Sequence, residues 1–237
     1  TLQKGGCLTI KKYKMVNIDT VYQTVLALAN KEQRGYITPQ EFNLFANHAQ
    51  NDIFEQYFYD LNQFKRAPGN SSNYADVTKI LESKINIFTT KYSANPTGGV
   101  AQPNDFYRIS QVSMDGVDCE YVTRSQQAYY DSPLTSPTKT RPVFYDFDGN
   151  FTFRPEGGQS VTISYIRKPK TPKWSYVVVN EKPLWNPSNA THFELHPSEE
   201  KNLIVKILKL AGISIEDPGV VTVASQEEVK DIQQEKA

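Results

Sequence analysis

The sequence has few of the side chains that most catalytic and metal sites need. It contains only 2 cysteines and 3 histidines among 237 residues. Cys7 and Cys119 lie far apart and match no zinc-binding or redox spacing, and a chain of this length does not depend on a disulfide framework. We therefore expect two free thiols in a reducing compartment. With so few His and Cys side chains, a nucleophile and its base are hard to assemble.

The sequence also lacks a charge excess and a long hydrophobic run. Lys and Arg number 26, as do Asp and Glu, so the formal net charge is zero. Proteins that coat nucleic acid usually carry a basic excess, which disfavours that class. The most apolar stretch, residues 203–215, is interrupted by Lys206 and Lys209 and is shorter than the roughly 18–20 residues of a membrane-spanning helix. We expect no membrane association.

Motifs for nucleotide, acyl or metal chemistry are missing too. There is no phosphate-binding loop, nucleophile elbow or His-Glu-x-x-His. The turn at Gly35 imitates half of a calcium loop, but Arg34 stands where an oxygen ligand belongs. His192 and His196 are four residues apart, yet Pro197 favours an extended residue before it rather than a helical pair of ligands. We predict no catalytic residue, no metal and no cofactor.

Both ends of the chain show the periodicity of amphipathic helices. We predict helices over residues 17–31, 38–64, 75–84, 198–212 and 217–234. The start of the second is the best defined, because the Thr38 hydroxyl can accept from the Glu41 amide while the Glu41 side chain reaches back. Pro39 suits the first helical position.

The centre of the chain changes to the two-residue alternation of strands. We predict strands over residues 85–90, 106–113, 117–122, 142–146, 150–154 and 161–166, with a short helix or turn at 126–130. Asp115-Gly116 and Asp148-Gly149 are typical of tight hairpin turns. The proline-rich residues 171–197 fit no element clearly.

This order of elements predicts an α+β fold. We expect helices from the N- and C-terminal parts to form one helical domain, residues 15–92 and 194–237, around an inserted antiparallel β module, residues 93–193. Residues 1–14 form a lysine-rich tail, and whether they belong to the mature protein stays open.

One dense run of charge stands out, from Arg167 to Trp174. It holds four cations in seven residues beside an aromatic ring, and two prolines stiffen it. Such a run can grip phosphates or an acidic protein surface, or it can simply be the solvated exit of a strand. The sequence leaves these three alternatives open.

Several segments together resemble bacteriophage neck proteins, the ring or head-to-tail adaptor proteins of short-tailed phages, crAss-like phages included. The segments are residues 33–42, 57–60, 106–109, 151–155, 161–170 and 210–213. The resemblance implies a virion protein that assembles into a homo-oligomeric ring of twelve copies between the portal protein and other neck or tail proteins. DNA would pass through the ring without sequence-specific binding. The protein would lie in the virion neck or tail, and in the host cytoplasm during assembly.

Two other functions stay open: a capsid decoration or fibre-associated protein, and a small-molecule-binding protein or enzyme. A ring subunit needs lateral contacts, whose centres favour Tyr, Phe, Trp and Arg. The predicted subunit interface comprises Tyr129, Tyr130, Tyr145, Arg167, Lys168, Lys170, Lys173 and Trp174.

Overall fold

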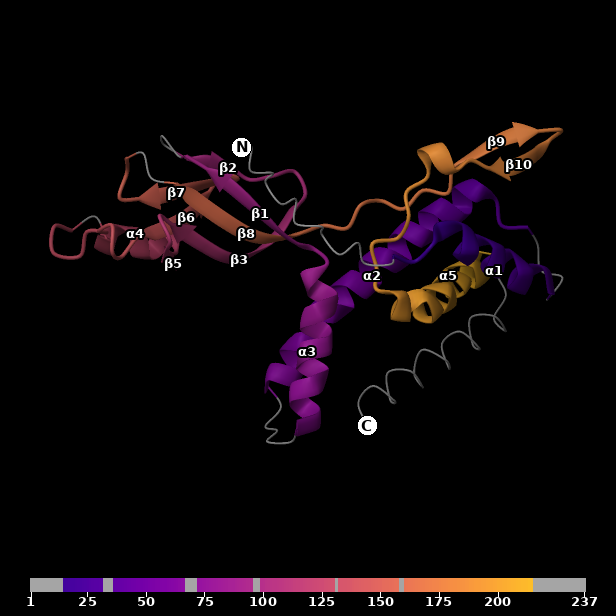
Figure 1. Ribbon diagram of the computed structural model, residues 1–237, viewed down its shortest axis with the longest axis horizontal. Helices are drawn as coiled ribbons and strands as arrows, with labels where there is room; N and C mark the ends of the chain where they lie inside the picture. The colour runs from indigo at the N-terminus through magenta and orange to yellow at the C-terminus, as the bar shows by residue number, and fades with distance from the viewer. Residues whose placement is uncertain are drawn as a thin grey trace, which may run out of the picture. The chain divides into compact units, whose positions relative to one another are not determined.

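The chain divides into two compact units (Figure 1). The computed structural model describes residues 15–31, 36–66, 72–95, 99–130, 132–157 and 160–214. Unit 1 combines Thr1–Ile87 with Pro169–Ala237, and unit 2 is the continuous segment Phe88–Lys168. Within this described part of the chain, helices account for 42% and antiparallel or mixed sheets for 29%, which confirms a mixed α+β class. The expected tail 1–14 and helix 217–234 lie outside the described residues.

Unit 1 is built on helices from both parts of the chain. They are α1 (Ile18–Lys31), α2 (Pro39–Arg66), α3 (Ser72–Asn86) and α5 (Glu200–Ser214). Helix α5 packs against α1 and α2, and α3 packs against α2. Val21, Phe42, Leu203 and Ile207 are fully buried among them. The apolar stripes of the sequence therefore mark the faces that form this core.

The helix starts have the capping that short polar side chains provide. The Asn17 side chain accepts from the Asp19 N–H at 2.9 Å at the start of α1. At α2 the Glu41 N–H donates to the Thr38 hydroxyl at 3.3 Å, while the Thr38 N–H donates to the Glu41 carboxylate at 2.9 Å. This reciprocal pair confirms the predicted capping box. The Thr38 N–H, and after it the Thr38 hydroxyl, which donates to the same carboxylate at 2.8 Å, lower the pKa of Glu41, because both bonds favour its charged form.

The proline-rich segment that fits no element in the sequence forms a hairpin in unit 1. Strands β9 (Tyr176–Val179) and β10 (Lys182–Trp185) pair antiparallel, followed by the short 3-10 helices η1 (Pro187–Asn189) and η2 (Pro197–Glu199). The two turn residues both have positive φ, 50° at Asn180 and 63° at Glu181. That is a type I′ turn without glycine, so it lacks the usual sequence signal.

Unit 2 contains two four-stranded sheets, ordered β1-β8-β3-β4 and β2-β7-β6-β5. The strands are β1 (Thr89–Ala94), β2 (Val100–Ala101), β3 (Phe106–Met114), β4 (Val117–Asp118), β5 (Glu120–Tyr121), β6 (Val143–Phe147), β7 (Asn150–Arg154) and β8 (Val161–Arg167). A short helix, α4 (Arg124–Tyr130), follows β5. Both predicted hairpins are confirmed, because positive φ occurs at each Asp-Gly turn, 48° and 86° in the first and 50° and 71° in the second.

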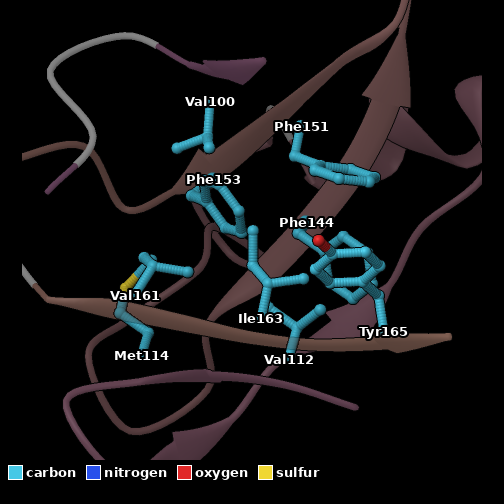
Figure 2. Packing of buried hydrophobic residues seen from close by; sticks show 9 residues of the cluster. All are labelled: Val100, Val112, Met114, Phe144, Phe151, Phe153, Val161, Ile163 and Tyr165. Atoms are coloured by element: carbon cyan, nitrogen blue, oxygen red, sulfur yellow. The ribbon is translucent and has the colours of Figure 1, made fainter. Parts of the chain in front are cut away.

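The core of unit 2 lies between the two sheets (Figure 2). Val112, Ile163 and Tyr165 come from one sheet, and Phe144, Phe151 and Phe153 come from the other. Face-to-face packing of this kind buries alternate residues of every strand. The two-residue alternation of the sequence is therefore the pattern of this sandwich.

Three features of the fold differ from the sequence-based expectation: the start of the first strand, the pairing of β5 and the extent of the inserted segment. Ile85 belongs to α3, and the first strand begins at Thr89 rather than at 85. Strand β5 pairs parallel to β6, so the expected purely antiparallel module is a mixed one. The connection over residues 122–142 explains this, because it is long enough for the crossover that a parallel pair needs.

The third difference is the extent of the inserted segment. It spans residues 88–168, whereas the expected module spans residues 93–193. Residues 169–193 belong to unit 1, and the side chains of Asn43 and Gln50 on α2 form hydrogen bonds with their backbone.

Candidate functional site

An extended segment, residues 169–196, is fixed along α2 by buried polar side chains. The Gln50 amide donates to the Lys170 carbonyl at 2.8 Å and accepts from the Glu194 N–H at 3.1 Å. The Glu194 carboxylate in turn accepts from the Lys170 N–H at 2.9 Å. Gln50 is fully buried. Each bond that it makes therefore replaces a hydrogen bond to water that the backbone group loses when the segment is buried.

A second amide, two turns earlier on α2, repeats this arrangement. The Asn43 side chain donates to the Trp174 carbonyl at 3.1 Å and accepts from the Trp174 N–H at 2.7 Å. We call Asn43 and Gln50 the amide pair. Sequence reasoning missed it, although two amides seven residues apart beside a helical apolar stripe are a usable signal.

Trp174, expected at a subunit interface, is a core residue of unit 1. Its side chain is 2% exposed, and its ring lies 4.4 Å from the ring of Tyr22 between centroids. Its indole N–H donates to the Asp19 carboxylate at 2.9 Å. The expectation is corrected here, because a ring buried by its own chain leaves almost no surface for a partner.

The basic run divides between the two units. Arg167 and Lys168 end unit 2, whereas Lys170 and Lys173 belong to unit 1. The three lysine side chains are exposed, while Arg167 is half-buried. Their backbone is held in place, since the Lys168 N–H donates within unit 2 and the Lys170 and Lys173 N–H groups donate within unit 1. Fixed backbone with exposed ammonium groups suits contact with an acidic surface.

Two of the tyrosines that we predicted at a subunit interface line the same pocket in unit 2. Tyr130 from α4 and Tyr145 from β6 line a volume of about 280 Å³, together with Gln127 and Arg154. The Arg154 guanidinium pairs with Glu156 at 3.1 Å. The side chain of Tyr129 lies outside the described part of the structure. The pocket presents aromatic and polar groups but no group of evident catalytic chemistry.

The β9–β10 hairpin of unit 1 exposes several apolar side chains. Val178 is 63% exposed, and Val177, Val179 and Leu184 are each about half exposed. Figure 1 shows the hairpin, in orange, extending past the helices of its unit. The sequence reading missed this surface because the turn carries Asn180-Glu181 rather than a glycine.

Two further titratable groups, Cys119 and Tyr165, have raised pKa values. Burial, with a smaller effect of the neighbouring Asp118 carboxylate, raises the pKa of the Cys119 thiol to about 11. A thiol with so high a pKa is a poor nucleophile at neutral pH. Burial, followed by the hydrogen bond to Asp105, raises the pKa of Tyr165. Among the described residues, no three His, Cys, Asp or Glu side chains gather closely enough to hold a metal ion.

A scan against protein-family models and a search of curated proteins both find no match to the chain. None of the described helices combines the length and the apolarity that crossing a bilayer requires.

Proposed function

We propose that the protein is a structural subunit of a bacteriophage neck ring, which links the portal protein to the tail and lets DNA pass. The proposal includes a helical body formed by both ends of the chain and an inserted β unit. Twelve copies would form the ring, in the virion neck and, before assembly, in the host cytoplasm. The resemblance of residues 33–42 and 161–170 to neck proteins motivates it.

One structural observation carries the proposal: the exposed apolar strand β9. Its residues Val177, Val178 and Val179 are uncharged and protrude on a hairpin rather than filling a core. A monomeric protein rarely exposes adjoining apolar side chains, whereas an assembly covers them with a neighbouring chain. The hairpin therefore favours a protein that works by binding other protein chains.

The exposed lysines of residues 167–173 fit the same proposal. They would meet an acidic surface on the next subunit or the next ring, which sets register more than affinity. Tight binding to DNA fits less well, because phosphate contacts would slow passage through a channel and the net charge of zero gives no general attraction.

The decisive experiment is a mass-spectrometric protein inventory of purified virions of the phage that encodes the chain. The proposal predicts the protein in every particle, at a copy number equal to that of the portal protein. Electron microscopy of the same particles should place it between head and tail. Absence from virions would overturn the proposal, and a position on the capsid shell would favour a decoration protein instead.

Charge reversal tests the basic run within this function. K168E together with K170E should reduce the yield of complete particles while the isolated subunit keeps its circular dichroism spectrum. The matched control is K91E with K139E, which reverses two exposed lysines outside the run. If both double variants assemble normally, residues 167–173 are a solvated strand exit and not part of the interface.

A further inference from the structure

The β9–β10 hairpin has a rigid base and an exposed end. The Trp174 ring stacks on Tyr176 at 5.8 Å and lies 5.5 Å from the Trp185 ring, between centroids. Tyr176 and Trp185 are directly paired in the hairpin. Since Trp174 is itself fixed by Asn43 and Asp19, the base of the hairpin is anchored in the core of unit 1. The strand ends beyond that anchor are presented in a fixed orientation.

One backbone hydrogen bond shows which residue pairs of the hairpin are bonded to each other. The Asn186 N–H donates to the Ser175 carbonyl at 2.9 Å, just beyond the paired strands. Bonded and non-bonded pairs alternate along antiparallel strands. The pair Val177–Leu184 is therefore a bonded one, and Val178–Pro183 is a non-bonded one. At a non-bonded pair, the backbone N–H and C=O of both residues point outward, away from the partner strand.

This alternation makes the two edges of the hairpin unlike. On the outer edge of β10 the outward positions are Trp185, at the base of the hairpin, and Pro183, which has no N–H to donate and has the charge of Lys182 beside it. Proline and lysine are the residues that close an edge to further strands. On the outer edge of β9 the outward positions are Tyr176, at the base of the hairpin, and Val178, and both keep their N–H and C=O groups. Strand β9 carries no charge and no proline.

The flat side of the hairpin adds an apolar surface to that edge. Directly paired residues lie on the same face, and so do residues two apart in one strand. Val177, Val179 and Leu184 therefore share one face, and all three are about half exposed. The opposite face carries Tyr176 and Trp185, which stack on Trp174.

We propose that the outer edge of β9 is a strand-addition site that takes an extended segment of a second copy of this chain. The added strand would bond to the outward backbone groups of Val178 and lay its side chains beside Val177 and Val179. Among the described residues β9 pairs with β10 alone, so this edge is open to an added strand. The inference rests on the proposed ring, in which a second copy adjoins each subunit.

The chemistry of the edge favours a copy of the same chain. It has no charge that would repel an identical chain or select an oppositely charged partner. Because the β9 edge is open and the β10 edge is closed, each hairpin accepts one added strand. Contacts between copies then run in one direction, and hairpins do not add to each other on both edges.

The test compares self-association of the full-length protein and three variants by sedimentation over a wide concentration range. V178P removes the outward N–H and mimics Pro183, whereas V178K keeps the N–H but adds a charge at the edge. V178T is the matched control, because it keeps the N–H and the branched shape. We expect about tenfold weaker association for V178P, the effect of losing roughly one to two hydrogen bonds, and a similar loss for V178K, because its charge opposes an added strand. V178T should change association little.

Two further measurements keep the outcome interpretable. Fluorescence of Trp174 and Trp185 reports whether the hairpin base is intact in each variant. Amide exchange over residues 176–185 should slow on association in the parent protein and in V178T. Association by V178P and V178K as strong as that of the parent protein would overturn the strand-addition site and leave the ring proposal standing. A parent protein that stays monomeric at every concentration would also overturn it, while the virion inventory decides the ring separately.

Discussion

The two units of this protein differ in how their chain segments are held together. Unit 2 is a continuous segment whose two sheets meet over apolar side chains such as Phe144, Phe151 and Ile163. Unit 1 joins two distant parts of the chain, and the amide pair on α2 binds backbone up to 144 residues away in sequence. Apolar packing supplies most of the stability of a core, whereas buried hydrogen bonds mainly select one arrangement. Both units therefore rest on apolar cores, and unit 1 depends in addition on the correct pairing of its distant segments.

The largest expected effect breaks unit 2 alone. Phe151 is fully buried, and its ring lies 5.4 Å from that of Phe106. We expect F151A to lower the free energy of unfolding of unit 2 by about 3–5 kcal/mol, because it leaves a cavity between the sheets. Hydrogen exchange should then quicken across residues 88–168 and stay slow in α2 and α5.

The matched control is F147A, which truncates a half-exposed phenylalanine at the end of β6. It should cost about 1 kcal/mol or less. If F151A exposes the amides of α2 to the same extent as those of β7, the two units unfold as one and the comparison fails.

The next effect tests the amide pair in unit 1. Q50A leaves the Lys170 carbonyl and the Glu194 N–H without their partner in a buried place. We expect a loss of about 2–4 kcal/mol in the unfolding of unit 1, measured by urea denaturation. Q40A, on an exposed position of the same helix, should change it by less than about 0.5 kcal/mol. Equal effects of Q50A and Q40A would show that residues 169–196 are not held by Gln50.

A smaller effect concerns the start of α2. T38A should cost about 1 kcal/mol, because it removes the hydroxyl that caps the helix. The capping bonds lower the pKa of Glu41, so its contribution is present above the ordinary carboxyl pKa and is lost as the pH falls through the lowered value. Stability measured against pH should therefore decline less in acid for T38A than for the parent protein. The same acid decline in both would contradict this role of Thr38.

The smallest expected effect is a change in the reactivity of the Cys119 thiol, which reports whether the two units open independently. Cys119 packs against the core of unit 2, and its raised pKa of about 11 leaves little thiolate at pH 8. In a C7S background, reaction with a disulfide reagent should be slow. F151A should accelerate it, whereas Q50A should not. Acceleration by Q50A as well would mean that opening unit 1 also opens unit 2.

Elements whose signals are local could be predicted from the sequence. Asp115-Gly116 and Asp148-Gly149 specify their turns because glycine adopts positive φ at little cost. The capping box at Thr38 needs only residues three apart. Apolar residues at helical spacing in α2 indicate its buried face, although Phe54 and Phe58 are buried too and lie off that spacing. The spaced residues that are buried are Phe42, Ala46, Ala49, Ile53 and Tyr57.

Features that depend on residues far apart in the chain could not be predicted from the sequence. Trp174 stands beside four cations in sequence, which suggests a surface, but Asn43 and Tyr22 bury it from far along the chain. The parallel pairing of β5 rests on two residues, too short for any periodicity. Of the candidate interface, the exposed Lys168, Lys170 and Lys173 could be anticipated, and the β9 edge could not, because its turn lacks glycine.

The amide pair also has a consequence for how the protein is made. On the ribosome, Gln50 emerges long before Glu194, and at about 5–20 residues per second the 144 intervening positions take roughly 7–30 s. All of Phe88–Lys168 is synthesised within that interval. Unit 2 can therefore form its two packed sheets first. During that interval the side-chain amides of Asn43 and Gln50 on α2 form hydrogen bonds with water. Residues 169–196, with the hairpin that they carry, and then α5 are made after unit 2 and complete the helical unit.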